Sequence, residues 1–152
     1  MITGVVVRWC GGGWVLAALI AAGCGGGAPE PVAIDLDRDT CASCRMVISS
    51  RATAAEIVRT GDEPRLFDDL ACLRDGIKAQ APPPDAVVFV VDHATGEWFR
   101  AERAIFTEVP GLQTPMGSGI IAHWDTAARN GDPDARGGRP LDPSQILGRP
   151  RP

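Results

Sequence analysis

A strand, a helix and a second strand are predicted from residues 65–91, RLFDDLACLRDGIKAQAPPPDAVVFVV. Arg65–Phe67 has the composition of a short strand, and either of the two aspartates that follow can cap a helix. That helix has one apolar side, formed by residues at spacings of three and four: Leu70, Leu73 and Ile77. Pro82–Pro84 ends the helix, and the apolar, β-branched run Ala86–Val91 is typical of a central strand.

Elements of the same kind are predicted on both sides of this stretch. Strand-like residues lie within 47–59, Glu97–Glu102 is a partner strand in a hairpin, and Gly119–Trp124 is a further strand. Asp125 then caps a short helix over Thr126–Arg129, and a last helical turn follows Asp142. Because strand, aspartate cap and helix recur in this order, the pattern suggests two small related β/α units.

The composition describes one soluble-type domain. The chain has 152 residues, 45% of them hydrophobic and 22% charged, and a net charge of -4. These values exclude a protein that spans the membrane several times and a disordered acidic tail. No basic cluster is present that could neutralise phosphates, so nucleic acid is not an expected partner.

The N-terminus is predicted to be an export signal. Residues 9–29 carry no charge, and their apolar part, 14–22, is shorter than the about 20 residues of a spanning helix, although a retained membrane anchor is the alternative. Ile20-Ala-Ala-Gly-Cys24 resembles a bacterial lipobox, in which the cysteine is lipidated. The predicted organisation is a signal peptide (1–23, which removes Cys10), a lipidated Cys24 with a flexible tether (24–32), a domain (33–148) and a disordered tail (149–152).

Sulfur is concentrated in Cys41-Ala-Ser-Cys44-Arg-Met46. If this segment enters a strand, Cys44 and Met46 leave the same face and can reach one ion. Thiolate and thioether are soft donors, so such a pair favours Cu(I) over zinc or hard cations. A second methionine, Met116, lies in the glycine-rich stretch 114–119, where a core methionine is less expected.

Three other interpretations of these residues remain open. Cys41 and Cys44 could form a redox dithiol or a disulfide. Zinc would need both of them with Cys72 and one histidine, His93 or His123, but the spacings match no common zinc motif. Cys72 on an apolar helix side can also be ordinary packing. No nucleophile elbow, metalloprotease helix or phosphate-binding loop is present, so the protein is not predicted to be an enzyme.

With these motifs in their order, the chain resembles the NosL family of copper-binding lipoproteins. The resemblance runs from Asp39 to Leu147 and rests on the lipobox and four later motifs: Cys41-x-x-Cys44-x-Met46, Phe67-Asp-Asp-x-x-Cys72-Leu, Pro115-Met116-Gly and Gly137-Gly-Arg-Pro-Leu141. It implies an α+β fold of two ββαβ-like units in one compact domain and a Cu(I) site formed by Cys44, Met46 and Met116. Cys41 is left as a further ligand or a disulfide partner, and Arg45 stands where the family usually has glycine.

The resemblance implies a membrane-anchored Cu(I) metallochaperone on the periplasmic side of a bacterial membrane. Its expected partners are an ABC-type maturation complex and nitrous oxide reductase, the recipient of the copper. Two alternatives are kept: an extracytoplasmic thiol-disulfide oxidoreductase that uses Cys41 and Cys44, and a general envelope copper handler with another recipient.

Overall fold

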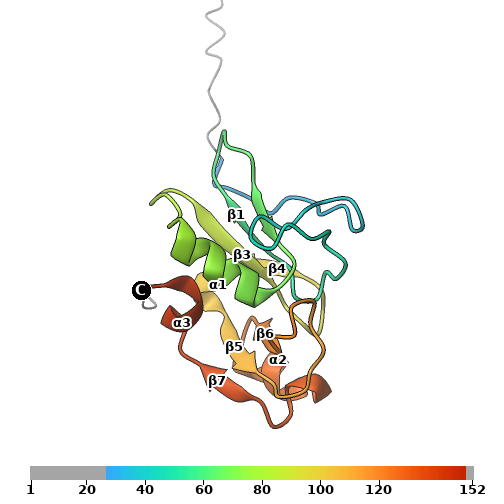
Figure 1. Cartoon of the computed structure of the whole chain (residues 1–152). Coiled ribbons are helices and arrows are strands. Elements are labelled where there is room, and N and C mark those ends of the chain that lie inside the picture. Colours follow the sequence, from blue (N-terminus) through green and yellow to red (C-terminus); the bar gives the residue numbers. More distant parts are fainter. Residues whose placement is uncertain (1–26, 150–152) are drawn as a thin grey trace, which may run out of the picture.

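The computed structural model describes residues 27–149 of the chain (Figure 1). The predicted signal peptide (1–23), Cys24 and residues 150–152 of the predicted tail lie outside the described residues. Residues 27–32 of the predicted tether form neither helix nor strand. Within 27–149 no helix combines the length and the apolar character needed to cross a bilayer.

The first unit is a four-stranded antiparallel sheet with one helix. Its elements in chain order are β1 (Ala55–Val58), β2 (Arg65–Phe67), α1 (Leu70–Ala79), β3 (Val87–Val91) and β4 (Trp98–Arg100). The strands lie in the order β2-β1-β3-β4, so β1 and β3 are the inner strands. The predicted central strand is therefore confirmed in β3, which is buried throughout.

The second unit is a three-stranded antiparallel sheet with short helices. Its elements are the 3-10 turn η1 (Ala101–Arg103), β5 (Ile105–Glu108), β6 (Ile120–His123), α2 (Thr126–Gly131), the 3-10 turn η2 (Pro133–Ala135), β7 (Arg139–Leu141) and α3 (Ser144–Leu147). The strand order is β6-β5-β7.

The two units share one connectivity. In each, the first strand lies between the second and the third, and a helix capped by aspartate connects the second strand to the third. The equivalence extends to register, because Phe67 faces Ala55 in the first unit as His123 faces Ile105 in the second. The structure thus confirms the α+β class and the two ββαβ-like units.

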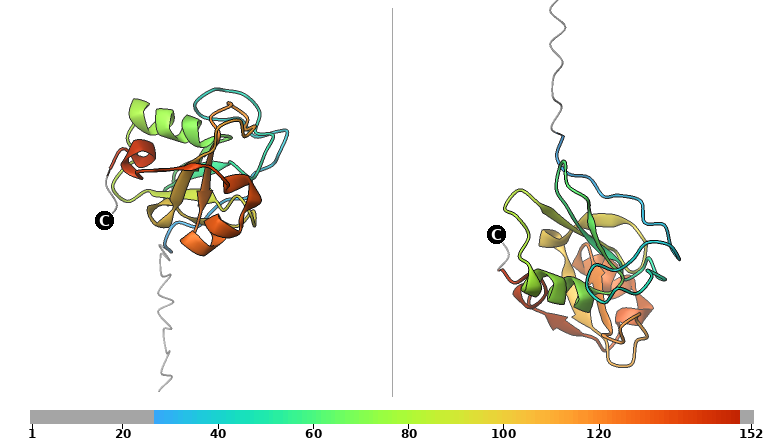
Figure 2. Two further views of the ribbon diagram at one scale, coloured as in Figure 1. Left: turned by 90° about the horizontal axis from the view of Figure 1, so that it is seen from below. Right: turned by 45° about the horizontal axis from the view of Figure 1, so that its top comes forward.

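One apolar core joins the two sheets. Ala55 and Ile57 of β1 lie in the same buried cluster as Leu73 of α1, together with Phe106 and Ile120 of the second sheet. Helix α1 crosses one face of the first sheet, and α3 lies beside it in all three views (Figures 1 and 2). The core thereby fixes the N-terminal end of α1 against the segment that carries Cys41 and Cys44.

Close packing of α1 on β2 depends on a glycine. A Cβ on Gly76 would lie 2.5 Å from Cε1 of Phe67, which leaves no room for a larger residue at this helix position. The guanidinium of Arg65 donates to the Gly76 carbonyl at 2.9 Å and closes the same contact from the strand side.

Some predicted boundaries differ from the structure. Only Ala55–Val58 of the extended run forms a strand, and strands β5 and β7 were not predicted. Residues 41–46 form a turn followed by an isolated bridge between Thr40 and Val47, so the condition under which Cys44 and Met46 would share a strand face is not met.

Candidate metal centre

Cys41 and Cys44 lie on a tight turn that is hydrogen-bonded to the sheet. The Cys41 N–H donates to the Met46 carbonyl at 2.8 Å, and the Arg45 N–H donates back to the Cys41 carbonyl at 3.0 Å. The Ala42 N–H donates to the carbonyl of Leu66 in β2 at 2.7 Å. These bonds place the turn directly beside the end of β2.

Helix α1 brings Cys72 to the same place. Its N-cap is Asp69, whose carboxylate accepts from the Ala71 N–H at 2.8 Å. Asp68 precedes the cap and Cys72 lies in the first helical turn. Because side chains of a first turn point back toward the helix N-terminus, Cys72 faces the turn that carries Cys41 and Cys44.

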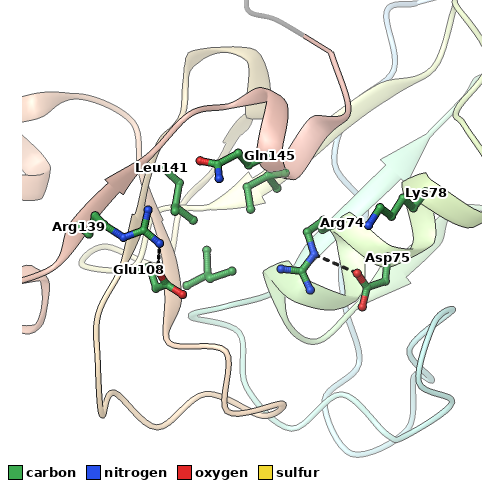
Figure 3. Close-up of a pocket in the computed structure, with 9 residues that line it drawn as sticks. Arg74, Asp75, Lys78, Glu108, Arg139, Leu141 and Gln145 are labelled. Carbon is green, nitrogen blue, oxygen red and sulfur yellow. Dashed lines mark hydrogen bonds and ion pairs between the residues drawn. The ribbon is translucent and has the colours of Figure 1, made fainter.

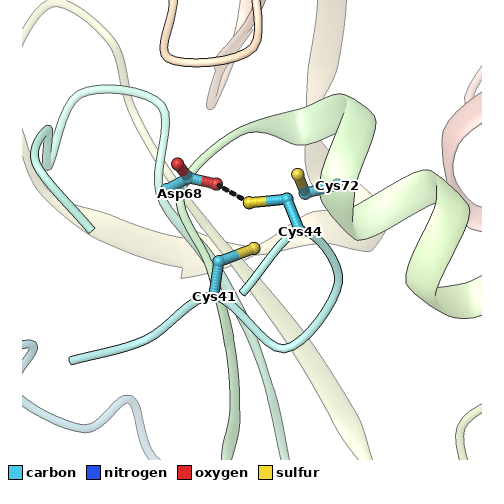
Figure 4. Close-up of side chains that lie close together, drawn as sticks. All are labelled: Cys41, Cys44, Asp68 and Cys72. Atoms are coloured by element: carbon cyan, nitrogen blue, oxygen red, sulfur yellow. Dashed lines mark hydrogen bonds between the residues drawn. The ribbon is translucent and has the colours of Figure 1, made fainter. Parts of the chain in front are cut away.

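Four donor atoms converge at this junction (Figure 4). The sulfurs of Cys41, Cys44 and Cys72 and a carboxylate oxygen of Asp68 all lie within 4.8 Å of one another. The Cys44 Sγ lies 3.6 Å from Asp68 Oδ1, and all three cysteines are free thiols. Cys44 is half-buried, whereas Cys41, Cys72 and Asp68 are buried. The structure therefore contains an arrangement compatible with a metal site, called here the cysteine cluster (Cys41, Cys44, Asp68 and Cys72).

The environment of the thiols disfavours a free thiolate. Burial raises the pKa of Cys44, a hydrogen bond from the Met46 N–H lowers it, and the Cys41 thiol raises it. Burial also raises the pKa of Cys72, and the charge and hydrogen bonding of Cys41 add to that effect. A cation bound between the sulfurs would favour the thiolate forms, because its positive charge attracts the negatively charged sulfurs.

Asp68 has a polar atom with no partner among the described residues. Its Oδ2 is buried and receives no hydrogen bond, although the residue is 0% exposed. A buried acceptor without a donor costs about 1–3 kcal/mol. The oxygen of Asp68 that faces the cysteine cluster is the other one, Oδ1, which lies 3.6 Å from Cys44 Sγ, so Oδ1 is the atom that a cation there could take as a ligand.

The two predicted methionine ligands lie at the surface. Met46 is 49% exposed on the cysteine turn, and Met116 is 45% exposed. The Met116 N–H donates to Asp69 Oδ2 at 3.0 Å, so its backbone is bound to the residue next to Asp68. The structure thus brings Cys41 and Cys44 together and leaves both thioethers exposed.

From the sequence alone, Asp68 and Cys72 are not predicted to be Cu(I) ligands. The aspartates were interpreted as helix caps and Cys72 as packing, and Asp69 and the buried Cys72 fit those roles. One feature of the sequence could have indicated the site. In Asp68-Asp-Leu-Ala-Cys72 the cysteine lies in the first turn of the predicted helix, so its side chain points back toward the end of the strand that precedes the helix.

The histidines of the zinc alternative lie elsewhere. His93 and His123 form a separate group with Asp132, so within residues 27–149 neither contributes to the cysteine cluster. A zinc site of three cysteines and one histidine does not assemble from these residues.

A surface pocket of about 320 Å³ lies apart from the predicted ligands, between α1, β5, β7 and α3 (Figure 3). Its charged side chains are largely paired, Arg74 with Asp75 and Arg139 with Glu108. None of the predicted site residues lines it.

No family model matches the chain, and comparisons with curated proteins and with solved structures gave no match either. The functional interpretation therefore rests on the geometry described above and on the sequence motifs.

Proposed function

We propose that the protein binds Cu(I) at the cysteine cluster and carries it, anchored by lipid on Cys24, on the periplasmic side of a bacterial membrane. The observation that carries this proposal is the convergence of three thiols and one carboxylate oxygen of Asp68 within 4.8 Å. Sulfur donors select Cu(I) among the common biological cations, because zinc structural sites take four Cys or His ligands and calcium and magnesium take oxygen.

The proposed ligands differ in access. Cys44 is the principal ligand because it is half-buried, whereas Cys41 and Cys72 are buried behind it. The thioethers of Met46 and Met116 are neutral, exposed donors, one on the cysteine turn and one on the loop bound to Asp69. Such donors can join the ion and leave it without moving a proton.

Transfer would proceed by exchange of ligands. A sulfur of the partner enters a coordination position that the carrier leaves open, and the carrier's own bonds then break in turn. The lipid tether confines carrier and partner to one surface and raises their effective concentration. By the family resemblance, the partner is an ABC-type maturation complex and the recipient is nitrous oxide reductase.

Competition for Cu(I) tests the ligand set. The reduced protein is titrated with Cu(I) against a chromogenic chelator, together with the variants Cys44→Ser, Met46→Leu and Met116→Leu. We expect Cys44→Ser to lose at least about tenfold in affinity and the methionine variants to lose less. The matched control is Leu36→Ala, an exposed apolar residue without a donor atom, which should bind as the parent does.

Unchanged affinity in Cys44→Ser would refute the copper site. If only the two methionine variants kept parental affinity, Cu(I) would bind through the thiols, and the sequence-derived methionine ligands would be wrong.

Thiol-disulfide exchange is the second candidate, because three free thiols lie close enough to react with one another. The raised pKa of Cys44 disfavours it, since exchange needs a thiolate. An oxidoreductase should reduce a disulfide substrate with catalytic turnover and tolerate Met46→Leu. A stoichiometric reaction that stops after one equivalent would exclude this activity.

A general envelope copper handler would use the same site and differ only in its recipient. Cu(I)-loaded protein is mixed with apo nitrous oxide reductase and its maturation complex, and with an unrelated periplasmic apo copper protein. Faster transfer to the first supports the maturation role, whereas equal rates support the general handler.

A further inference from the structure

A second group of metal-binding side chains lies in the other unit of the fold. His93 follows β3, His123 is the last residue of β6, and Asp132 is the C-cap of α2. One donor atom from each lies within 4.8 Å of the others. The sequence shows no motif around either histidine, because His93 lies 39 residues before Asp132 and His123 and Asp132 match no common metal-binding spacing.

Both imidazoles converge on one carboxylate oxygen. Asp132 Oδ2 lies 2.7 Å from Nδ1 of His93 and 2.9 Å from Nε2 of His123. The other oxygen, Oδ1, accepts from the Asp134 N–H at 2.9 Å. Burial raises the pKa of Asp132, but the hydrogen bonds from His123 and His93 outweigh it, so the net pKa is lowered and the group is a carboxylate.

The group is enclosed, and His93 is its most exposed member. The side chains of His123 and Asp132 are 0% and 4% exposed, whereas His93 is 13% exposed. An ion would therefore enter past the His93 ring. Nδ1 of His123 is also buried and has no partner among the described residues, so the hydrogen bonds of this group are incomplete.

We propose that His93, His123 and Asp132 form a site for a borderline divalent cation of the Zn²⁺ class. Two imidazole nitrogens and one carboxylate oxygen are a common zinc donor set, with a fourth position left for water. This site goes beyond the proposed function, because its nitrogen and oxygen donors are chemically distinct from the sulfur of the cysteine cluster and do not favour Cu(I).

Binding replaces two hydrogen bonds with metal bonds. In the ion-free protein the ring nitrogens that face Asp132 carry protons, because a carboxylate only accepts. With an ion bound, each ring proton moves to the other nitrogen, which for His123 is the buried Nδ1. That N–H would lack the acceptor that usually orients a metal-bound histidine, so we expect weaker affinity than at zinc sites with such a partner.

The test uses Zn²⁺ for affinity and Co²⁺ as a spectroscopic probe of the donors. In the full-length protein with Cys41, Cys44 and Cys72 replaced by Ala, we expect one equivalent of Zn²⁺ to bind. Co²⁺ should give visible ligand-field bands without thiolate charge-transfer bands. His93→Gln should lower the Zn²⁺ affinity at least about tenfold, because its amide can still donate to Asp132 but is a poor ligand. Asp134→Asn, an exposed acid two residues from Asp132, is the matched control and should bind as the parent does.

If the cysteine-free variant does not fold, the same comparison is made by Co²⁺ difference spectra in the native background. There His93→Gln should lose the ligand-field component and keep the sulfur bands. Equal Zn²⁺ affinity and equal Co²⁺ spectra in parent and His93→Gln would overturn the proposal. The three residues would then be a hydrogen-bonded group that links segments of the fold and binds no metal. Loss of Cu(I) binding in Cys44→Ser is independent of this result, so the two proposals can fail separately.

Discussion

Arg45 adopts a backbone conformation that favours glycine. Its φ is +67°, in the left-handed region where a Cβ crowds the following carbonyl and costs about 1–2 kcal/mol. This conformation turns the following residue back, so that the Met46 carbonyl accepts from the Cys41 N–H at 2.8 Å. Arg45 is therefore a strained residue within this turn.

We expect Arg45→Gly to stabilise the protein. Relief of strain exceeds the added flexibility of the unfolded chain, so the net gain should be about 0.5–1 kcal/mol in denaturant unfolding. Arg38→Gly is the matched control, because Arg38 is exposed and has no positive φ. It should lose stability. A loss in both variants would show that the turn does not strain Arg45.

Glu56 is a buried acid in an inner strand of the first sheet. Its Oε1 accepts from the Val32 N–H at 3.0 Å, and its Oε2 has no partner within the described part of the chain. Burial raises the pKa of Glu56 from 4.5 to about 7, although the Val32 N–H partly opposes the rise. The folded protein therefore holds a proton here that the unfolded chain releases at lower pH.

The sign of the resulting pH dependence follows from the raised pKa. The stabilising contribution is complete below pH 4.5 and is lost as the pH rises through about 7. Glu56→Gln, which has no proton to lose, should gain about 2–3 kcal/mol relative to the parent between pH 5 and pH 8. Unfolding of both proteins at the two pH values measures this difference. Parallel curves would show that Glu56 stays ionised in the fold.

At the scale of elements, Asp69 fastens a helix and a loop together. Its carboxylate accepts from the Ala71 N–H of α1, and also from the Thr114 hydroxyl at 2.7 Å, the Met116 N–H at 3.0 Å and the Ser118 hydroxyl at 2.7 Å. Asp125, the N-cap of α2, accepts from Ala128.

Replacing the two caps should separate these roles. Asp125→Ala loses a cap and should cost about 1 kcal/mol in unfolding free energy. Asp69→Ala also leaves three partly buried donors of the 114–118 loop without this acceptor, so we expect about 2–4 kcal/mol. Hydrogen exchange should rise at 114–119 only in Asp69→Ala. Equal costs and unchanged exchange would mean that the loop is held by other contacts.

Elements with strong periodicity could be predicted from the sequence, and short edge strands could not. Helix α1 has a complete apolar side and a cap, and β3 is apolar throughout. Strand β7 is Arg139-Pro-Leu141, three residues whose identity as a strand depends on pairing with β5. Proline is compatible with this place because β7 is an edge strand, a property that only the assembled sheet reveals.

At the scale of the molecule, the cysteine cluster was predicted in part. The local spacing of Cys41 and Cys44 marked both as candidate ligands or redox thiols, because both residues lie on one short segment, but it did not predict the turn that holds them. Cys72 lies beside them only because packing in the core holds α1 in a fixed position against the sheet. No local pattern contains that information, and the same holds for His93, His123 and Asp132.

Since the cysteine cluster joins a turn to a helix, Cu(I) should stabilise the whole fold. An ion at a free concentration one hundred times its dissociation constant adds about 2.7 kcal/mol to the free energy of unfolding. Thermal unfolding of reduced protein with and without Cu(I) measures this shift. In Cys72→Ser the shift should shrink, whatever the variant's own stability. A full shift in Cys72→Ser would place the ion on the turn alone.

The shared connectivity of the two units gives a rule for redesigning the protein. By their distance from the capping aspartates Asp69 and Asp125, Asp68 corresponds to Trp124 and Cys72 to Ala128. Both candidate ion sites take a ligand from the end of the strand that leads into a capped helix. This corner of the fold can therefore change its side chains while the core stays constant, and it is the place where new donor sets could be grafted.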